Sequence, residues 1–515
     1  MTSLVLGFAQ ALGLYLVTTN LPAIQGALQA TSSELDWLTT AYFGSVLSST
    51  ALLAKFRLQY GLQRFASLGL TLFLVIAALH LATASLASAI AVRAGLGFAA
   101  APLSALAVLY MVEAFPQRLA VVGLVLGFAA LQIALPVARV LGPGLLDLGL
   151  WHRLFLFDVA LALMSWAAIH AVQLAPQPLS ESFGKGDLIV FPLYAAGLFL
   201  LTVVVSQGRS HWWTDAPWLG VCLVGSVVCT ALYLMIDLRR DRPLLDLRWL
   251  ATPYMLRFVF TVTLFRVLLS EQNIGIVGLM NAAGLGNEQM RVMFSFAAVA
   301  TLAGFGFAAL VAYKKGLYVL AILAACLASL CAFSDADATR LTRPDQLLLT
   351  QTTFAFANAV FFASSCLFGF GPVVRDGNRQ IVSLLAAFSF AHYMGSLIGT
   401  AWITTSVADA QRWHFAELAQ HISIGDPIAA NRLLQSGAAL AASLPDAGQR
   451  SVQALATLTQ QFASEATVLA YNDVFRMIGW LGAWMAAWMV FLAWRARVRA
   501  ALAAPVATSA APIAS

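Results

Sequence analysis

The chain is organised as long apolar stretches separated by short polar connections. Stretches of roughly 20 residues, the length that crosses the hydrocarbon core of a bilayer as a helix, follow one another from residue 4 to residue 494. The first stretch leads directly into further stretches, so we interpret it as a helix rather than a cleaved signal peptide. The pattern predicts fourteen spans, at residues 4–24, 36–54, 65–84, 87–111, 119–141, 153–173, 188–206, 217–237, 255–282, 290–312, 316–334, 347–371, 381–407 and 470–494.

Composition agrees with a protein that faces lipid rather than water. Hydrophobic residues make up 61% of the 515 residues and charged residues only 10%, whereas about a quarter of a soluble domain is charged. The net charge of +6 does not indicate nucleic-acid binding, because the basic residues sit in short loops. The five cysteines lie in or beside apolar stretches, which is typical of small buried residues and not of a disulfide framework or metal site. We expect no cofactor.

The distribution of lysine and arginine predicts the orientation. Basic residues are concentrated in alternate connections, such as 55–64 and 239–248, and after the last stretch, at 495–499. Because cytoplasmic loops carry the excess of Lys and Arg, we expect both termini in the cytoplasm. An even number of spans agrees with this arrangement. The sequence therefore predicts a multi-pass protein of the inner (plasma) membrane.

Two connections differ from the short loops. Residues 408–468 form a stretch on the predicted outer side, with an Ala/Gln/Leu-rich run after Ser451 that is compatible with helix. A connection this long is usually functional or disordered, so it is either a solvated loop or a docking surface for a periplasmic partner. The other connection, 238–254, is a basic linker on the cytoplasmic side. The Ala-rich tail, 500–515, is expected to be disordered.

Four ordered motifs carry a family resemblance. The first stretch ends in NLPAIQGAL at 20–28, and segment 91–102 reads AVRAGLGFAAAP. Segment 123–159 contains Gly142 and Pro143 in sequence, and AYNDVFRMIGW precedes the last stretch. In this order the chain resembles the fourteen-helix drug:proton antiporters of the major facilitator superfamily, the EmrB type. The resemblance implies an all-α integral membrane protein with the major facilitator fold.

That resemblance also implies a domain plan and partners. We expect six-helix bundles at 1–187 and 255–499, joined by two central helices and the cytoplasmic linker at 188–254. The expected function is alternating-access export of small amphipathic compounds by proton antiport. A periplasmic adaptor protein and an outer-membrane channel are possible partners of the long outer connection.

The chain departs from the family pattern at two places. An acidic residue is expected in the first helix shortly before the ALP-like motif, and here Gly13 takes that position. The loop between the second and third stretches reads AKFRLQYGLQRF, with Leu58 and Gln59 where the family has Asp and Arg. These departures leave two alternatives open: transport without proton coupling, or a scaffold or receptor with a transporter fold. A membrane-bound enzyme is disfavoured, because the histidines are scattered and no P-loop occurs.

Ionisable side chains inside the spans are the candidate mechanistic residues, since each costs on the order of 3 kcal/mol at the bilayer centre. Arg93 matches the family's R-x-x-x-G motif, which implies proton or substrate handling; the alternative is structural pairing with a carboxylate or carbonyl groups. Glu271 lies mid-span and is the best remaining proton-carrying carboxylate. Arg266 is five residues earlier, so the two do not share a helix face cleanly.

Three further positions complete the candidate set. His392 is a lone imidazole, more typical of a hydrogen-bonded core residue than of a proton relay. Asp158 lies near the predicted outer boundary, where we expect an interfacial salt bridge. Proline bends a helix by removing a hydrogen bond, and the resemblance implies that the bend at Gly142 and Pro143 limits leak.

Overall fold

The computed structural model describes residues 1–116, 119–146, 151–172, 182–312, 316–375, 380–420 and 446–503, with isolated residues between 421 and 445. The described part is helical. Its elements are α1 Thr2–Thr18, α2 Leu21–Leu28, α3 Ser32–Tyr60, α4 Leu62–Leu79, η1 His80–Ala82, α5 Leu86–Glu113, α6 Ala120–Gln132, α7 Ala134–Leu146, α8 His152–Ala171, α9 Asp187–Gln207, α10 Pro217–Asp237, α11 Leu247–Leu250, α12 Pro253–Leu268, η3 Glu271–Ile276, α13 Val277–Ala282, α14 Arg291–Ala312, α15 Leu317–Asp335, α16 Leu348–Arg375, α17 Ile381–Gln420 and α19 Ala447–Ala503.

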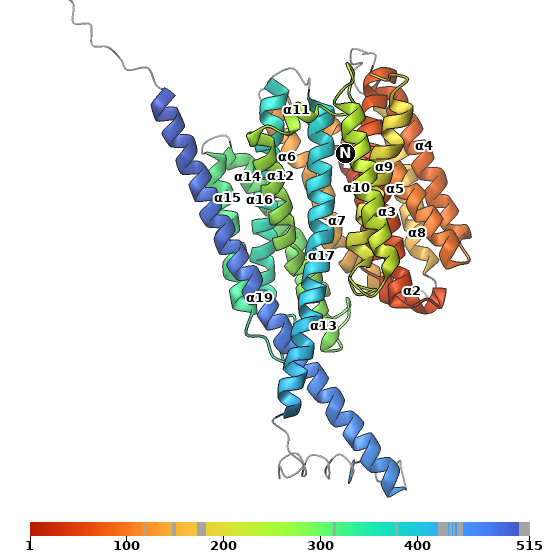
Figure 1. The fold of residues 1–515 in the computed structure, drawn as a ribbon, viewed down its shortest axis with the longest axis vertical. Coiled ribbons are helices and arrows are strands. Elements are labelled where there is room, and N and C mark those ends of the chain that lie inside the picture. Colours follow the sequence, from red (N-terminus) through yellow and green to blue (C-terminus); the bar gives the residue numbers. More distant parts are fainter. Residues whose placement is uncertain are drawn as a thin grey trace, which may run out of the picture.

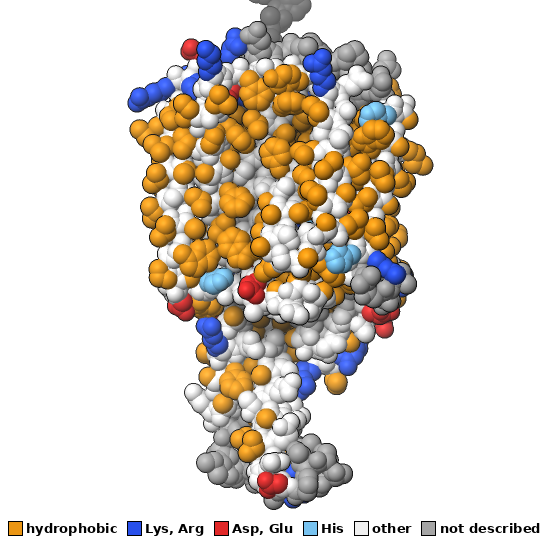
Figure 2. All heavy atoms as spheres, turned by 90° about the vertical axis from the view of Figure 1, so that its right-hand side faces the viewer, with side chains coloured by type: hydrophobic (Ala, Val, Ile, Leu, Met, Phe, Trp, Pro, Cys, Tyr) orange, Lys and Arg blue, Asp and Glu red, His pale blue; other side chains and the backbone are white. Residues whose placement is uncertain are grey.

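The protein is a multi-pass membrane protein, as predicted. Twelve helices of the described chain are long and apolar enough to cross a membrane, and thirteen if the bent pair α1 and α2 is one span. Hydrophobic side chains cover the middle of the bundle, while charged side chains gather towards its two ends (Figure 2). The predicted second span corresponds to α3, which has 29 residues. This helix is long enough to cross a membrane, but its many Ser and Thr residues make it less apolar than the twelve.

The helices pack in two groups with a helix pair beside them (Figure 1). In the first group α5 contacts α3, α4 and α1, and in the second α14 contacts α16 while α15 contacts α16 and α19. The groups meet where α17 contacts α3 and where α14 contacts α6 and α7. The pair α9 and α10 packs against the first group through α3.

Local sequence signals set several helix ends. Thr31 and Glu34 form a reciprocal capping box at the start of α3, and Ser85 and Ser88 do the same for α5. Such caps satisfy backbone N–H groups that have no partner within the helix. Between α3 and α4, Gly61 has φ +87°, a conformation that L residues with a side chain rarely adopt.

Two of the predicted continuous spans are broken. The chain turns by 64° between α1 and α2, where Asn20 precedes Pro22. The predicted span 255–282 is interrupted by the π-helical turn η3, which begins at Glu271. A π-turn displaces the backbone register locally and is frequent at functional sites.

The long outer connection is mostly helix where the structure describes it, which corrects the expectation of a loop beginning at residue 408. Helix α17 continues to Gln420, and α19 runs without a break from Ala447 to Ala503. Their ends project beyond the bundle as a stalk (Figures 1 and 2). At 1.5 Å per residue the 57 residues of α19 extend roughly 85 Å, far more than the ~30 Å hydrocarbon core. The same helix includes the first residues of the predicted disordered tail; residues 504–515 lie outside the described part.

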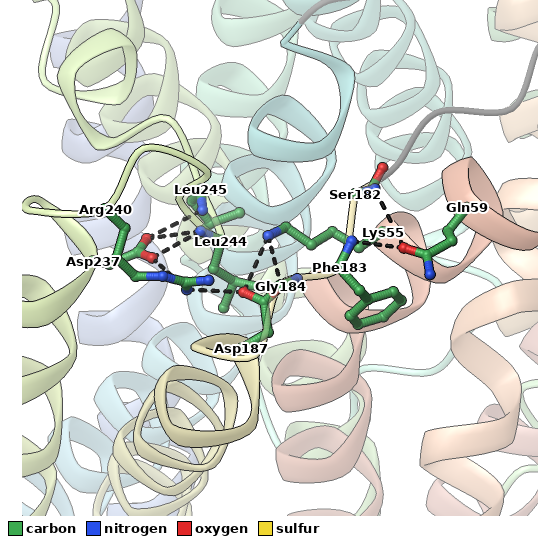
Figure 3. A network of polar contacts seen from close by, with 10 residues as sticks. All are labelled: Lys55, Gln59, Ser182, Phe183, Gly184, Asp187, Asp237, Arg240, Leu244 and Leu245. Atoms are coloured by element: carbon green, nitrogen blue, oxygen red, sulfur yellow. Dashed lines mark hydrogen bonds and ion pairs between the residues drawn. The ribbon is translucent and has the colours of Figure 1, made fainter.

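A buried ion cluster joins the central helix pair to α3 (Figure 3). Lys55 Nζ lies 3.1 Å from Asp187 Oδ1, and Arg240 Nη1 lies 2.8 Å from the same oxygen. Gln59 Oε1 accepts hydrogen bonds from the backbone N–H groups of Ser182 and Phe183 at 3.3 and 2.7 Å. Leu58 and Gln59 lie in the last turn of α3 and not in a loop as predicted, and Gln59 contacts the segment before α9.

Candidate functional site

Two buried carboxylates share one amide donor in the second helix group. Glu271 opens the π-turn η3 and Asp335 ends α15. Gln351 of α16 donates from Nε2 to Glu271 Oε1 at 3.2 Å and to Asp335 Oδ2 at 2.8 Å. Gln272 Nε2 in turn donates to the Gln351 carbonyl at 2.9 Å. We call Glu271, Asp335 and Gln351 the carboxylate pair site.

Both carboxylates of this site are buried. Glu271 is 0% and Asp335 2% exposed, and Glu271 Oε2 and Asp335 Oδ1 have no hydrogen-bond partner among the described residues. Two negative charges sharing one neutral donor in a dry interior repel each other, and burial disfavours each charged form.

The structure confirms that Glu271 is buried inside a span, and it adds Asp335, which the sequence did not indicate. Asp335 follows the predicted span 316–334 and precedes a second aspartate, Asp337, so it has the pattern of a loop residue. Only the packing of α15 against α16 brings it to Gln351. No feature of the linear pattern links these helices.

Arg93 is held by carbonyl groups of α1. It is 1% exposed and donates to the carbonyl oxygens of Gly13 at 2.6 Å and Leu14 at 3.5 Å. Its guanidinium also lies over the Tyr42 ring, 4.6 Å from the centroid. The carbonyl groups named in the structural alternative are therefore its hydrogen-bond partners in this conformation.

Asp158 does not form the expected interfacial salt bridge. It is 1% exposed, and neither carboxylate oxygen has a hydrogen-bond partner among the described residues. A Cβ added at Gly13 would lie 3.8 Å from Asp158 Oδ2. Helix α8 thus brings a carboxylate to the position where the family pattern has one on the first helix. The prediction failed because span periodicity does not show that α8 packs against α1.

Two cavities lie between the helix groups. The first, which we call the arginine cavity, has a volume of about 150 Å³ and is lined by Arg139, Arg209 and Arg266 together with Asp36 and Tyr15. The second, the aromatic cavity, has about 300 Å³ and is lined largely by apolar side chains, among them Phe362, Phe370 and Phe388, with His392 and Tyr15.

The four ionisable candidates do not meet in either of these two cavities. Arg266 lines the arginine cavity and His392 lines the aromatic cavity. Arg93 and Glu271 line neither of them. His392 Nδ1 has no hydrogen-bond partner among the described residues, and its ring lies 5.4 Å from that of Phe362. It therefore lacks the hydrogen bond expected of a core histidine.

Gly142 lies beside a set of hydrogen bonds that joins α7 and the end of α1 to Asn287, in the segment after α13. Arg139 of α7 donates to Asn287 Oδ1 at 2.9 Å, and Asn287 Nδ2 donates to the Thr19 carbonyl at 2.8 Å. We call Arg139, Asn287, Thr19 and Asn20 the Asn287 latch. A Cβ at Gly142 would lie 2.6 Å from the Asn20 amide. Only glycine at position 142 therefore leaves room for the Asn20 side chain. Pro143 lies inside α7.

Comparisons with known proteins agree with this architecture. No family model matches the chain. The multidrug export protein EmrB of Haemophilus influenzae is 22% identical over 512 residues, 95% of this chain and 93% of that protein. The drug efflux pump JefA of Mycobacterium tuberculosis is 26% identical over 434 residues, 80% of each. The structure of the major facilitator superfamily proton:xylose symporter XylE covers 95% of this chain and 94% of its own, with a TM-score of 0.56 and 14% identity.

The chain has the major facilitator fold. It is a transporter-type protein, not an enzyme, and is distantly related to drug exporters. In such folds the substrate site lies between two repeats that rock about it. Both cavities here lie between the two helix groups.

Proposed function

We propose that this protein exports small amphipathic compounds across the inner membrane by proton antiport. The observation that carries the proposal is the carboxylate pair site, where Glu271 and Asp335 share the Gln351 amide. A buried carboxylate that binds and releases a proton links transport to the proton gradient, which supplies about 2.3 kcal/mol per charge per 100 mV besides the pH difference. The distant similarity to two drug exporters supports the same direction of transport.

We propose two six-helix halves, residues 1–187 and 255–499, around the central helices and linker of 188–254. The grouping of helices supports this division, because α9 and α10 pack outside the first group and the groups touch through few elements. The two cavities lie along this boundary.

We propose fourteen spans, with α3 as a span in addition to those that are clearly apolar. Its contacts with α5 and α9 support this, because they place its serines and threonines against other helices. Thr40 and Ser48, for example, hydrogen-bond Ser206 and the Ala195 carbonyl. The N-terminus and the end of α19 lie towards the same end of the bundle (Figure 1), which requires an even number of crossings.

Both termini are then cytoplasmic, and the stalk and the Asn287 latch face the periplasm. The ion cluster of Lys55, Asp187 and Arg240 lies at the cytoplasmic end, where the excess of basic residues belongs. The aromatic cavity reaches this end too, since Arg57 and Glu113 line it. We infer an inward-facing arrangement closed on the periplasmic side.

The stalk is proposed to contact a periplasmic adaptor protein that leads to an outer-membrane channel. Exposed apolar side chains support this role: Trp413 is 61%, Val452 69% and Leu455 56% exposed. Aromatic and aliphatic residues outside the lipid zone are typical of protein contacts.

Proton coupling is tested in proteoliposomes that contain a trapped pH dye. Naphthalene-2-sulfonate, chloramphenicol and tetraphenylphosphonium serve as an anionic, a neutral and a cationic amphipath. We expect at least one to be moved only when a pH gradient is imposed. Glu271→Gln keeps the side-chain size and removes titration, so we expect gradient-driven transport to fall by about a hundredfold, the lower range for loss of a positioned proton-transfer group.

Asp335→Asn is the matched variant at the same site and should behave similarly. Arg257→Gln, on α12 but remote from the pair, is the control and should transport normally. Full gradient-driven transport in Glu271→Gln would exclude Glu271 as the proton carrier. Movement of a compound without any gradient would instead favour a facilitator, and no movement of any of the three would favour a scaffold or receptor.

A further inference from the structure

The arginine cavity carries more positive charge than its surroundings neutralise. It lies between the helix groups, with lining residues from α1, α3, α7, α9, α12, η3 and α17. Arg139 and Arg266 are 6% and 8% exposed. Among the residues that line the cavity, Asp36 is the one carboxylate.

That carboxylate is already paired. Arg209 Nη2 lies 2.6 Å from Asp36 Oδ1, and Ser210 Oγ hydrogen-bonds the other oxygen. Asp36 therefore balances the charge of Arg209. The positive charges of Arg139 and Arg266 need another source of negative charge.

Arg139 and Arg266 are bound by neutral groups in the described part of the chain. Arg139 donates to Asn287 Oδ1 and to the Asn273 carbonyl at 2.9 and 3.1 Å. Arg266 interacts with the Tyr15 hydroxyl. The Nε atom of each arginine is buried and has no hydrogen-bond partner among the described residues.

An uncompensated guanidinium at membrane depth costs free energy. Buried charges are normally paired or hydrogen-bonded, and intramembrane arginines are rare and mark a substrate or ion pathway. An arginine cannot lose its proton under ordinary conditions, so its charge persists. The group that would balance it is an anion that enters the cavity.

We propose that the transported compounds are amphipathic anions, with the carboxylate, sulfonate or phosphate group bound at Arg266 and Arg139. This inference rests on the proposed transport function and names its substrate class. The cavity's volume of about 150 Å³ suits a small polar head. Side chains of Ser270, Ser396 and Thr400 line the same space. The hydroxyl groups of Ser270 and Thr400 donate to the backbone carbonyl oxygens of Arg266 and Ser396.

The apolar part of such a compound has a place next to this head site. Tyr15 lines both the arginine cavity and the aromatic cavity. The aromatic cavity is about twice as large, at about 300 Å³, and its phenylalanines Phe362, Phe370 and Phe388 bind aromatic or aliphatic surface. An anionic head and an apolar body thus match two adjoining environments.

The test uses two probes of the same shape and different charge. Naphthalene-2-sulfonate is anionic at neutral pH, and naphthalene-2-sulfonamide is neutral. Binding is measured by equilibrium dialysis against the full chain in nanodiscs, with empty nanodiscs subtracted. We expect saturable binding of the sulfonate at least about tenfold tighter than that of the sulfonamide, a difference of about 1.4 kcal/mol.

Variants of Arg266 then test whether its positive charge binds the sulfonate group. Arg266→Gln should weaken sulfonate binding by about tenfold or more and leave sulfonamide binding unchanged. Arg266→Lys keeps the charge without the planar fork and should bind with intermediate strength. Arg257→Gln is the matched control, because Arg257 is on the same helix but lines a different cavity with Tyr254 and Tyr318. It should bind both probes as the unmodified protein does.

Equal binding of the two probes by the unmodified protein, or no saturable binding of the sulfonate, would overturn the proposal, and neither result depends on a variant that folds poorly. Unchanged sulfonate binding in Arg266→Gln would overturn the role of Arg266. No pH gradient is present in this measurement. A failure of proton coupling therefore leaves it unaffected, and the two proposals can fail separately.

Discussion

Single residues define the chemistry of this protein through neighbours on other helices. Asp158 on α8 lies beside Gly13 on α1, and Arg93 on α5 donates to the Gly13 carbonyl. Glycine at position 13 leaves the space that the Asp158 carboxylate approaches. The first helix has glycine where the family that the chain resembles carries an acid, and an adjacent helix places a carboxylate beside that position.

The Asp158 carboxylate is expected to take part in proton coupling, and exchanging the two positions tests this. Asp158→Ala should lower gradient-driven transport. Adding Gly13→Asp should restore part of it, because the new carboxylate enters the space that alanine leaves. Gly13→Asp alone should lower transport, since two carboxylates would then lie side by side. The measurement is dye-reported proton flux in proteoliposomes.

A purely structural role would give a different result. If the double variant transports no better than Asp158→Ala, the carboxylate has no function at that point in space. Gly13→Ala is the control for added bulk. Its Cβ meets Phe73 at 3.5 Å, an ordinary van der Waals contact, so we expect normal transport.

At this scale the sequence predicted ionisable groups in spans but not their partners. Glu271 is recognised because a carboxylate in the middle of an apolar stretch is costly. Asp335 and Gln351 are not, since they sit near the ends of other stretches. Contacts between spans depend on how helices are packed, and a repeat of apolar residues contains no such information.

At the scale of helices, the R-x-x-x-G motif of α5 has a physical basis. A Cβ at Gly97 would overlap the Tyr42 carbonyl oxygen of α3. The glycine thus lets two long helices approach closely, and the same approach brings the Tyr42 ring under Arg93. The sequence predicted the motif and both helices, and the structure adds the reason for the spacing.

Gly97→Ala should therefore destabilise the protein by about 1–3 kcal/mol, the usual cost of overpacking. The matched control is Gly306→Ala on α14, where no atom lies within 4 Å of an added Cβ. It should leave stability unchanged or raise it, because alanine favours helix. Thermal unfolding in detergent, followed by circular dichroism, compares the two. Equal unfolding temperatures of the two variants would contradict the close approach of α5 to α3 at Gly97.

The broken span shows where helical periodicity fails. Residues 255–282 are apolar enough to be predicted as one helix, but Glu271, Gln272 and Asn273 need partners that a lipid-facing helix cannot offer. The π-turn lets Gln272 reach Gln351 and the Asn273 carbonyl accept from Arg139. A hydropathy average over a whole span cannot show a break of this length.

At the scale of the molecule, hydropathy predicted the membrane-spanning class, and the ordered motifs predicted the fold. The stalk was not predicted as a pair of extended helices. Residues 447–470 are rich in Ala and Gln, so they lack the apolar pattern by which a helix in lipid is recognised. They form the first part of α19, whose later part is packed against α15 and α17.

Deleting residues 421–460 should abolish efflux from whole cells and preserve transport in proteoliposomes, if the stalk binds an adaptor. The deletion keeps the contacts at the stalk base, where His414 Nε2 lies 2.7 Å from Asp473 and Arg340 lies 3.9 Å from Glu465. The double variant Val452→Ser with Leu455→Ser removes exposed apolar surface without shortening the chain. It should also lower efflux from whole cells. Normal efflux from cells that carry the deletion would show that no docking occurs there.

The unbroken course of α19 has a mechanical consequence. A single helix reaches from the end of the bundle where the N-terminus lies to the far tip of the stalk (Figure 1). A lateral force on the tip would tilt α19 about the place where it packs against α15. A partner that grips the tip could thereby bias which way the transporter opens without touching the substrate.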